Sequence, residues 1–358
     1  MSNQLSLRLS VRTASLTLCA AALAPTAAAQ VTFTNGVLAI TGTPGNDDIT
    51  LQVGPLPGEV EVQGVAGPVS GGTFFGVRGV SATLGAGQDK VQVLGSAPVL
   101  PRLDLDFGAG LADASVDFTF AASPAPLAAS GIRIVTGDQD DVVNVLLKTN
   151  AGGTSVFLDL ALGNGKNDVT TFVEPENTSS AVRVWTNFNG GSGEDIVTAT
   201  VGGATPLAEC VLTGNLGAGN DEAKVVLGAF ASGQARLDAT LDLGAGDDKF
   251  DLVSSDANTN VLGSVRTGDG QDTLELVSNR RFTGGILLDA GAGNDSVKLI
   301  STQPNDSASR ILAGDGDDTV EVLRGSGTNQ TPTTSDGGAG FDVFTGIGDV
   351  TNFEVVNR

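Results

Sequence analysis

Aspartates that follow paired glycines are the residues of this chain best suited to do chemistry. The element reads Gly, any residue, Gly, any residue, Asp, and its clearest copies begin at positions 85, 191, 217, 244, 268, 291, 314 and 338. Glycine permits backbone conformations with positive φ and leaves the carbonyl groups of a turn unobstructed. Carboxylate and carbonyl oxygens are hard donors, the kind that Ca²⁺ prefers in proteins. The element therefore predicts a turn that binds calcium.

Strands must position these turns, because the residues around them alternate between apolar and polar. Val91 and Val93 follow one turn, and Leu241 and Leu243 precede another. A period of two indicates strands that bury one face. The turns recur about every 25 residues from residue 85 onward, and one turn per period is typical of a solenoid. We expect an all-β fold: a parallel β-solenoid, of the β-helix or β-roll kind, with coils of about 25 residues and one Gly-Asp turn per coil.

Stacking of such coils would place equivalent aspartates about 4.8 Å apart, as a ladder along one edge. Two unit charges about 5 Å apart repel by roughly 3 kcal/mol at an effective dielectric constant of about 20, and a hard cation between successive turns would remove this repulsion. In the alternative interpretation, each aspartate only caps its own turn, which predicts one acid per turn. Several turns carry more, as at Asp138, Asp140 and Asp141 and at Asp247 and Asp248. The extra acids favour calcium.

The turns resemble the glycine-rich nonapeptide repeat of haemolysin-type, or repeats-in-toxin (RTX), calcium-binding proteins. Residues 41–49 are similar to a first copy of that repeat, and residues 338–344 with 352–356 are similar to its end. The resemblance implies that consecutive turns hold several Ca²⁺ ions through the aspartates and backbone carbonyls. The longer period of this chain departs from the family and implies one calcium edge and one loop edge.

Carried over to this sequence, the resemblance implies metal ligands at eleven aspartates. Asp47 belongs to a copy that lacks the first glycine, and Asp113 comes one residue late in its copy. Asn167 stands where an aspartate is expected, so its turn receives no ligand. The implied ligands are Asp47, Asp89, Asp113, Asp141, Asp195, Asp221, Asp248, Asp272, Asp295, Asp318 and Asp342.

The start of the chain predicts export. A positively charged beginning, an apolar run and small residues before Gln30 are typical of a secretory signal peptide. No later segment is apolar enough to span a membrane, so we expect a protein that is secreted and lies outside the cell or on its surface. The predicted organisation is a signal peptide at 1–29, N-terminal capping and initial coils at 30–83, calcium-binding repeats at 84–345 and a C-terminal cap strand at 346–358.

Composition excludes several functions. The chain has 19 Lys and Arg against 41 Asp and Glu and no His. The acidic balance argues against nucleic-acid binding, and without His neither a Ser-His-Asp triad nor a His-ligated zinc site can form. Cys210 follows the acidic Glu209 and fits an inward strand position, so we expect a buried thiol rather than a nucleophile.

These observations favour a protein that is not an enzyme: a secreted calcium-binding β-solenoid with a structural, surface or adhesive role. Its expected partners are calcium ions and cell-surface or extracellular matrix components. The alternative is a β-helix lyase or epimerase acting on acidic polysaccharide, which would need a base and cationic groups. An ice-binding solenoid would need Thr-any-Thr in coil after coil, and only isolated copies such as Thr198–Thr200 occur.

Overall fold

A computed structural model describes the chain at residues 29–64, 72–121, 130–150, 154–175, 182–203, 207–230, 234–255, 258–279, 282–303, 306–325 and 333–357. Residues 1–28 of the predicted signal peptide lie outside these ranges.

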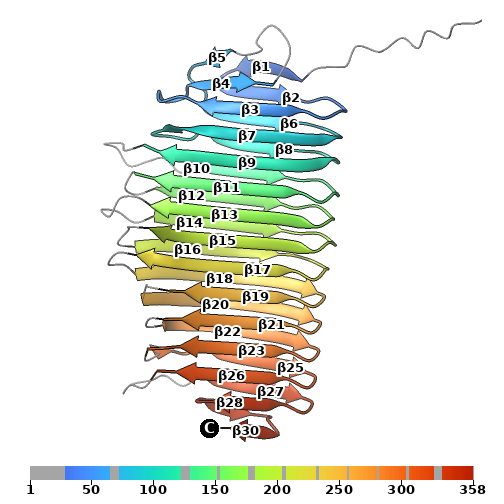
Figure 1. Cartoon of the computed structure of the whole chain (residues 1–358), viewed down its shortest axis with the longest axis vertical. Helices are drawn as coiled ribbons and strands as arrows, with labels where there is room; N and C mark the ends of the chain where they lie inside the picture. The colour runs from blue at the N-terminus through green and yellow to red at the C-terminus, as the bar shows by residue number, and fades with distance from the viewer. Residues whose placement is uncertain are drawn as a thin grey trace, which may run out of the picture.

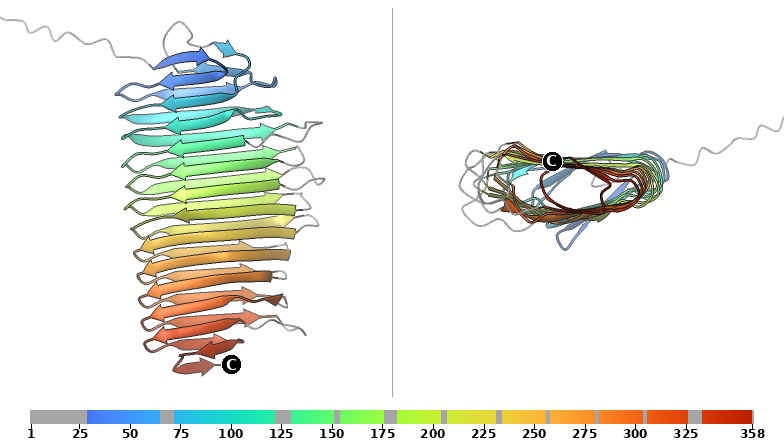
Figure 2. Two further views of the ribbon diagram at one scale, coloured as in Figure 1. Left: turned by 180° about the vertical axis from the view of Figure 1, so that it is seen from behind. Right: turned by 90° about the horizontal axis from the view of Figure 1, so that it is seen from below.

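Two long sheets, A and B, face each other across one core, and the chain alternates between them coil after coil (Figure 1). Viewed along its long axis, the molecule is a flattened ring with the sheets as its two broad sides (Figure 2). Sheet A contains β1 (Gln30–Thr34), β2 (Val37–Thr41), β6 (Gly79–Thr83), β8 (Arg102–Asp106), β10 (Ser130–Val135), β12 (Ser155–Ala161), β14 (Val182–Asn189), β16 (Leu207–Asn215), β18 (Gln234–Ala245), β20 (Asn258–Asp269), β22 (Phe282–Ala292), β24 (Asp306–Ser307), β25 (Arg310–Asp315), β27 (Thr334–Ala339) and β29 (Asp349–Thr351). Sheet B contains β3 (Asp48–Val53), β4 (Val60–Gln63), β5 (Thr73–Phe74), β7 (Gln88–Ala97), β9 (Leu111–Phe120), β11 (Val142–Thr149), β13 (Asn167–Pro175), β15 (Asp195–Gly203), β17 (Glu222–Phe230), β19 (Lys249–Ser254), β21 (Thr273–Ser278), β23 (Ser296–Ser301), β26 (Thr319–Arg324), β28 (Val343–Gly346) and β30 (Val355–Asn357).

Equivalent strands of successive coils pair in parallel and in register. Gly244 of β18 lies opposite Gly268 of β20, which lies opposite Gly291 of β22. In the described residues, antiparallel pairing occurs at the N-terminal end, where β1 pairs with β2, β3 with β4, and β4 with β5. The prediction of an all-β parallel β-solenoid is confirmed.

The core lies between the sheets and follows from the alternation in the sequence. In β11, Val143, Val145 and Leu147 are fully buried, whereas Val142 before them and Asn144 between them are exposed. A strand places successive side chains on opposite faces, so each coil adds one inward row from each sheet. Burial of the apolar rows is the main stabilising contribution of each coil.

The two edges of the solenoid differ. Along one edge, on the right in Figure 1, most sheet A strands pass into a sheet B strand through a Gly-Asp turn or a degenerate copy of it, and we name this side the turn edge. Along the opposite edge, sheet B strands lead back to sheet A through connections of different lengths. The turn edge is therefore the constant part of the coil and the place where equivalent side chains align.

Candidate metal centre

Ten of the eleven predicted ligands form one column along the turn edge, which we name the aspartate ladder. Each lies at or beside the start of a sheet B strand, and none has more than 7% of its surface exposed. The ladder consists of Asp47, Asp89, Asp141, Asp195, Asp221, Asp248, Asp272, Asp295, Asp318 and Asp342.

Hydrogen bonds join successive rungs of the ladder. Asp248 Oδ1 accepts the backbone N–H of Asp221 at 2.8 Å, and Asp272 Oδ1 accepts that of Asp248 at 2.7 Å. The same contact recurs in every coil from Asp195 to Asp342, with distances of 2.7 to 3.0 Å. From Asp221 to Asp342, each carboxylate is thus held by the coil before it through one of its two oxygens, whereas Asp47 Oδ2 accepts the N–H of Thr43 in its own turn at 2.7 Å.

The second oxygen, Oδ2, is buried and has no hydrogen-bond partner in nine rungs, namely Asp89, Asp141, Asp195, Asp221, Asp248, Asp272, Asp295, Asp318 and Asp342. No ladder aspartate forms an ion pair with a Lys or Arg of the described residues. A buried carboxylate oxygen without a donor is costly unless a proton or a cation compensates it.

The pKa values of these carboxyl groups reflect that cost. Burial, which disfavours the charged form, raises the pKa of Asp248 and Asp295 from 3.8 to about 7, and the charges of neighbouring rungs add to the effect. Burial likewise raises the pKa of Asp195 and Asp221 to about 6. The ladder therefore holds several carboxylates that are poorly stabilised as anions by the protein alone.

Glycine is required in these turns because successive turns stack in close contact. Gly244 and Gly246 adopt φ angles of +112° and +135°, which side chains rarely allow. A Cβ at Gly244 would collide with the carbonyl oxygen of Gly217, and one at Gly246 with that of Gly219. The two glycines of the element thus let the carbonyls of one turn approach the next.

A second column, not anticipated from the sequence, occupies the residue just before each rung. Asn220 Oδ1 accepts the backbone N–H of Asp247, and Asp247 Oδ1 accepts that of Gln271, both at 2.9 Å. Asp140 bonds Lys166 N–H in the same way. This corrects the interpretation of the extra acids: they are exposed and stabilise the next turn, so their number alone is not evidence for calcium. In the sequence, the recurrence of Asn or Asp directly before the rung aspartate is the signal that could have predicted this column.

Asp113 lies outside the ladder, contrary to the prediction. Ala112 takes the rung position, and its N–H donates to Asp141 Oδ1 at 2.6 Å. Asp113 instead points outward, where its carboxylate lies 3.5 Å from Lys90 Nζ. A delay of one residue along a strand moves a side chain to the opposite face, so Asp113 is removed from the candidate ligands.

Asn167 occupies the rung between Asp141 and Asp195, and its contacts identify the oxygen atoms that surround this position. Its Nδ2 lies 2.6 Å from Asp195 Oδ1 and 3.4 Å from the carbonyl oxygens of both Gly163 and Gly165. Three oxygens, from one turn and from the next coil, thus converge on a positively polarised nitrogen. At this coil an amide nitrogen therefore takes the place of a carboxylate oxygen, while Asp195 Oδ2 and Asn167 Oδ1 remain buried without a hydrogen-bond partner.

The donor set of the turn edge fits a hard cation. Among the described residues no three His, Cys, Asp or Glu side chains converge on one point, so a cation here would depend on one or two carboxylates completed by backbone carbonyls. The unpartnered Oδ2 atoms and the carbonyls that approach Asn167 Nδ2 are oxygens of this kind. An all-oxygen set with flexible geometry is typical of Ca²⁺.

The fold and the ladder define a class: a parallel β-solenoid with one buried, acidic edge. Comparison of the chain with models of known families, with curated proteins and with solved structures finds no match. In the part of the chain that the structure describes, no helix is long and apolar enough to cross a membrane.

Proposed function

We propose that this chain is a secreted calcium-binding β-solenoid with a structural, surface or adhesive role, in which Ca²⁺ ions lie between stacked Gly-Asp turns. The observation that carries the proposal is the buried, unpartnered Oδ2 of nine ladder aspartates. When bound, calcium supplies the positive charge that these oxygens lack, and the glycine carbonyls complete its shell.

The competing interpretation is that protons alone neutralise the ladder and that the turns are purely structural. Both interpretations use the same geometry, but they differ in what happens above the raised pKa values of Asp248 and Asp295. Protons then leave, whereas a bound divalent cation keeps the carboxylates compensated. A metal titration at neutral or slightly alkaline pH separates the two.

The test is a calcium titration of chelator-treated protein, followed by circular dichroism and calorimetry. Calcium should increase the β signal, raise the melting temperature and bind at several sites, because ligands that bind only the folded state stabilise it. Magnesium should act more weakly, since it dehydrates reluctantly and prefers rigid octahedral sites. Identical melting curves in chelator and in calcium would refute the proposal.

The proposed location outside the cell depends on the predicted signal peptide at 1–29. N-terminal sequencing of the exported protein tests this prediction, and Gln30 should be the first residue. The enzyme alternative has no observation in its favour among the described residues. The ladder carboxylates are buried within the turns, and burial raises the pKa of the Cys210 thiol to about 12, far from that of a nucleophile.

A further inference from the structure

Basic residues divide between the two faces of the solenoid. The strands of sheet A carry six arginines and no lysine, whereas those of sheet B carry five lysines and one arginine. Most arginines of sheet A have an acidic partner on a neighbouring strand; Arg183 Nε, for example, lies 2.9 Å from Glu209. Arg78, just before β6, and Arg102, in β8, are exposed and form no ion pair with any described residue.

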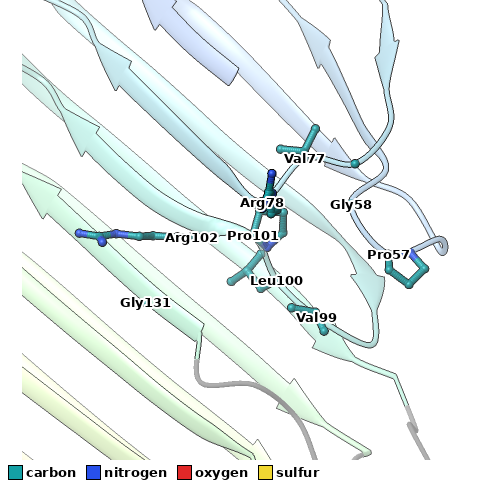
Figure 3. A pocket seen from close by; sticks show the side chains of 10 residues that line it. Pro57, Gly58, Val77, Arg78, Val99, Leu100, Pro101, Arg102 and Gly131 are labelled. Carbon is teal, nitrogen blue, oxygen red and sulfur yellow. The ribbon is translucent and has the colours of Figure 1, made fainter. Parts of the chain in front are cut away.

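A cavity of about 530 Å³ opens beside these two arginines near the N-terminal end of sheet A (Figure 3). Its ten lining residues include Arg78 and Arg102, no acidic residue, and an apolar wall with Pro57, Val77 and Leu100. In a chain of net charge −22, a cavity with two guanidinium groups and no carboxylate is complementary to an anion. Arg310, by contrast, lines a second cavity together with Asp336 and Asp349.

Two stacked aromatic rings stand on the same face, next to this cavity. The rings of Phe157 in β12 and Trp185 in β14 are 4.5 Å apart and inclined by only 7°, and Phe157 is 43% exposed. The ring separation of 4.5 Å is close to the spacing of adjacent strands. The two rings are therefore stacked one above the other along the solenoid axis, with their planes across it. The face of Phe157 that does not contact Trp185 therefore points toward the next strand, where its partner in register is Gly131.

Gly131 leaves a slot between the aromatic ring and the arginine. A Cβ added at Gly131 would meet no atom within 4 Å in the part of the chain that the structure describes, so this residue leaves room for a side chain. Gly131 also lines the cavity, and Arg102 extends along the sheet on the side of the cavity where Gly131 lies (Figure 3). From Arg102 to Phe157 the slot spans two strand spacings, about 9.6 Å, enough for one sugar ring between an aromatic face and a guanidinium group.

We propose that this slot and cavity bind a uronate unit of an acidic polysaccharide, with the carboxylate at Arg102 and the apolar face of the sugar ring against Phe157; Arg78, whose Nη2 donates to the carbonyl oxygen of Asn35 at 3.4 Å, adds positive charge nearby. Guanidinium groups bind carboxylates through two parallel hydrogen bonds, and an exposed aromatic face packs against the C–H groups of a sugar. Trp185 stacks on the face of Phe157 that lies away from the slot, so the slot ends at the Phe157 ring and accommodates one sugar unit of the chain. None of the ten described residues that line the cavity is a general acid or base, and the proposal concerns binding alone and does not depend on calcium in the ladder.

The probe is a tetramer of galacturonate, too short to gel with calcium, titrated by calorimetry into the full chain at a fixed calcium concentration. The tetramer should bind, and its methyl ester, which has the same sugars without charge, should bind at least about tenfold more weakly. Arg102→Gln should also weaken binding about tenfold, because one charge-assisted pair is lost. Arg310→Gln, on the same sheet but among acids, should leave the affinity unchanged.

Gly131→Leu is the sharpest variant, because it fills the slot at a position with room for a side chain. It should abolish binding without lowering the melting temperature. Phe157→Ser, an exposed change on the same face, should weaken binding and provides a second readout if the leucine variant folds poorly. No binding of the tetramer, equal binding of the ester, equal losses in Arg102→Gln and Arg310→Gln, or full affinity in both slot variants would each overturn the proposal.

Discussion

Asn167 Nδ2 lies 2.6 Å from Asp195 Oδ1, so at one coil a neutral amide donor fills the rung that aspartates fill in most other coils. The contact shows that a positively polarised atom fits between two successive rungs. Asn and Asp have the same shape, so the ladder is interrupted at this position only because an amide nitrogen replaces a carboxylate oxygen.

Asn167→Asp should convert this interruption into an additional rung. Without calcium, the new buried carboxylate faces that of Asp195, and we expect a loss of about 1–3 kcal/mol of unfolding free energy. With calcium, the variant should recover its stability and bind one more ion. Melting curves with chelator and with calcium measure both effects. Asn144→Asp, an exposed change in β11, serves as the control, and equal effects of the two variants would contradict the prediction.

The calcium-free protein should lose stability as the pH rises. The ladder pKa values are raised on folding, from 3.8 to about 6 for Asp221 and about 7 for Asp295, so the folded state binds more protons than the unfolded state in this range. The stabilising contribution of these protonated carboxyl groups to the free energy of unfolding is therefore complete below about pH 4 and is lost as the pH rises through about 6 to 7. Denaturation in chelator between pH 5 and pH 8 measures the slope. Calcium should flatten it, and a stability that rises with pH in chelator would exclude this explanation.

Adjacent aspartates should respond differently to the same substitution. Asp248→Asn removes a rung carboxylate, so we expect fewer bound ions, the loss confined to the neighbouring coils, because a solenoid is coupled through nearest neighbours. Asp247→Asn keeps the oxygen that accepts Gln271 N–H and should change the stoichiometry little. Calorimetry, which measures the number of calcium ions that each variant binds, compares the two variants. Loss of all sites in Asp248→Asn, or equal losses in both variants, would show that the ladder is not a row of local sites.

Turn glycines should be far less tolerant than Gly131. Gly246→Ala places a methyl group against the carbonyl oxygen of Gly219 at a φ of +135°, and we expect a loss of more than about 1 kcal/mol of unfolding free energy. Gly131→Ala has open space and should be neutral or slightly stabilising. Urea denaturation of the two variants gives the comparison. Similar stabilities would mean that the stacked turns relax easily.

The C-terminal residues should protect the last coil. Glu354 Oε2 accepts the N–H of Asp342 at 2.7 Å, and the ring of Phe353 packs edge-on against Phe344 at 5.5 Å. Deleting 349–358 would expose β27 and β28 as bare strands, so we expect concentration-dependent association. Analytical ultracentrifugation tests this, with Glu354→Gln, which keeps an acceptor, as the control. A truncated chain that stays monomeric with unchanged stability would rule out a capping role.

The sequence was informative where its signals are local. The alternation around residues such as Val91 and Leu243 predicted the strands and their buried faces, and the repeat predicted the aspartate ladder. Relations between coils were harder to predict. The one-residue offset that turns Asp113 outward and the hydrogen bond that Asp247 N–H donates to Asn220 Oδ1 depend on register, which is set by neighbours some 25 residues away.

The slot at Gly131 could not be predicted for a related reason. It requires Arg102 and Phe157, from different coils, to flank the same glycine across the sheet. The first coil is also irregular, since Asp47 and Asp89 are 42 residues apart, whereas later rungs differ by 23 to 29. The repeat period alone does not predict which residues such an insertion places on a face of the solenoid.

The register of the turn glycines has a genetic consequence. Because Gly244, Gly268 and Gly291 occupy the same place in successive coils, recombination between the gene segments that encode them would delete or duplicate one whole coil. In the resulting protein, the strands beside the junction would pair in the same register with equivalent strands of another coil, and the length of the rod would change. A lineage could thus lengthen or shorten this molecule in single steps while its two ends stayed as they are.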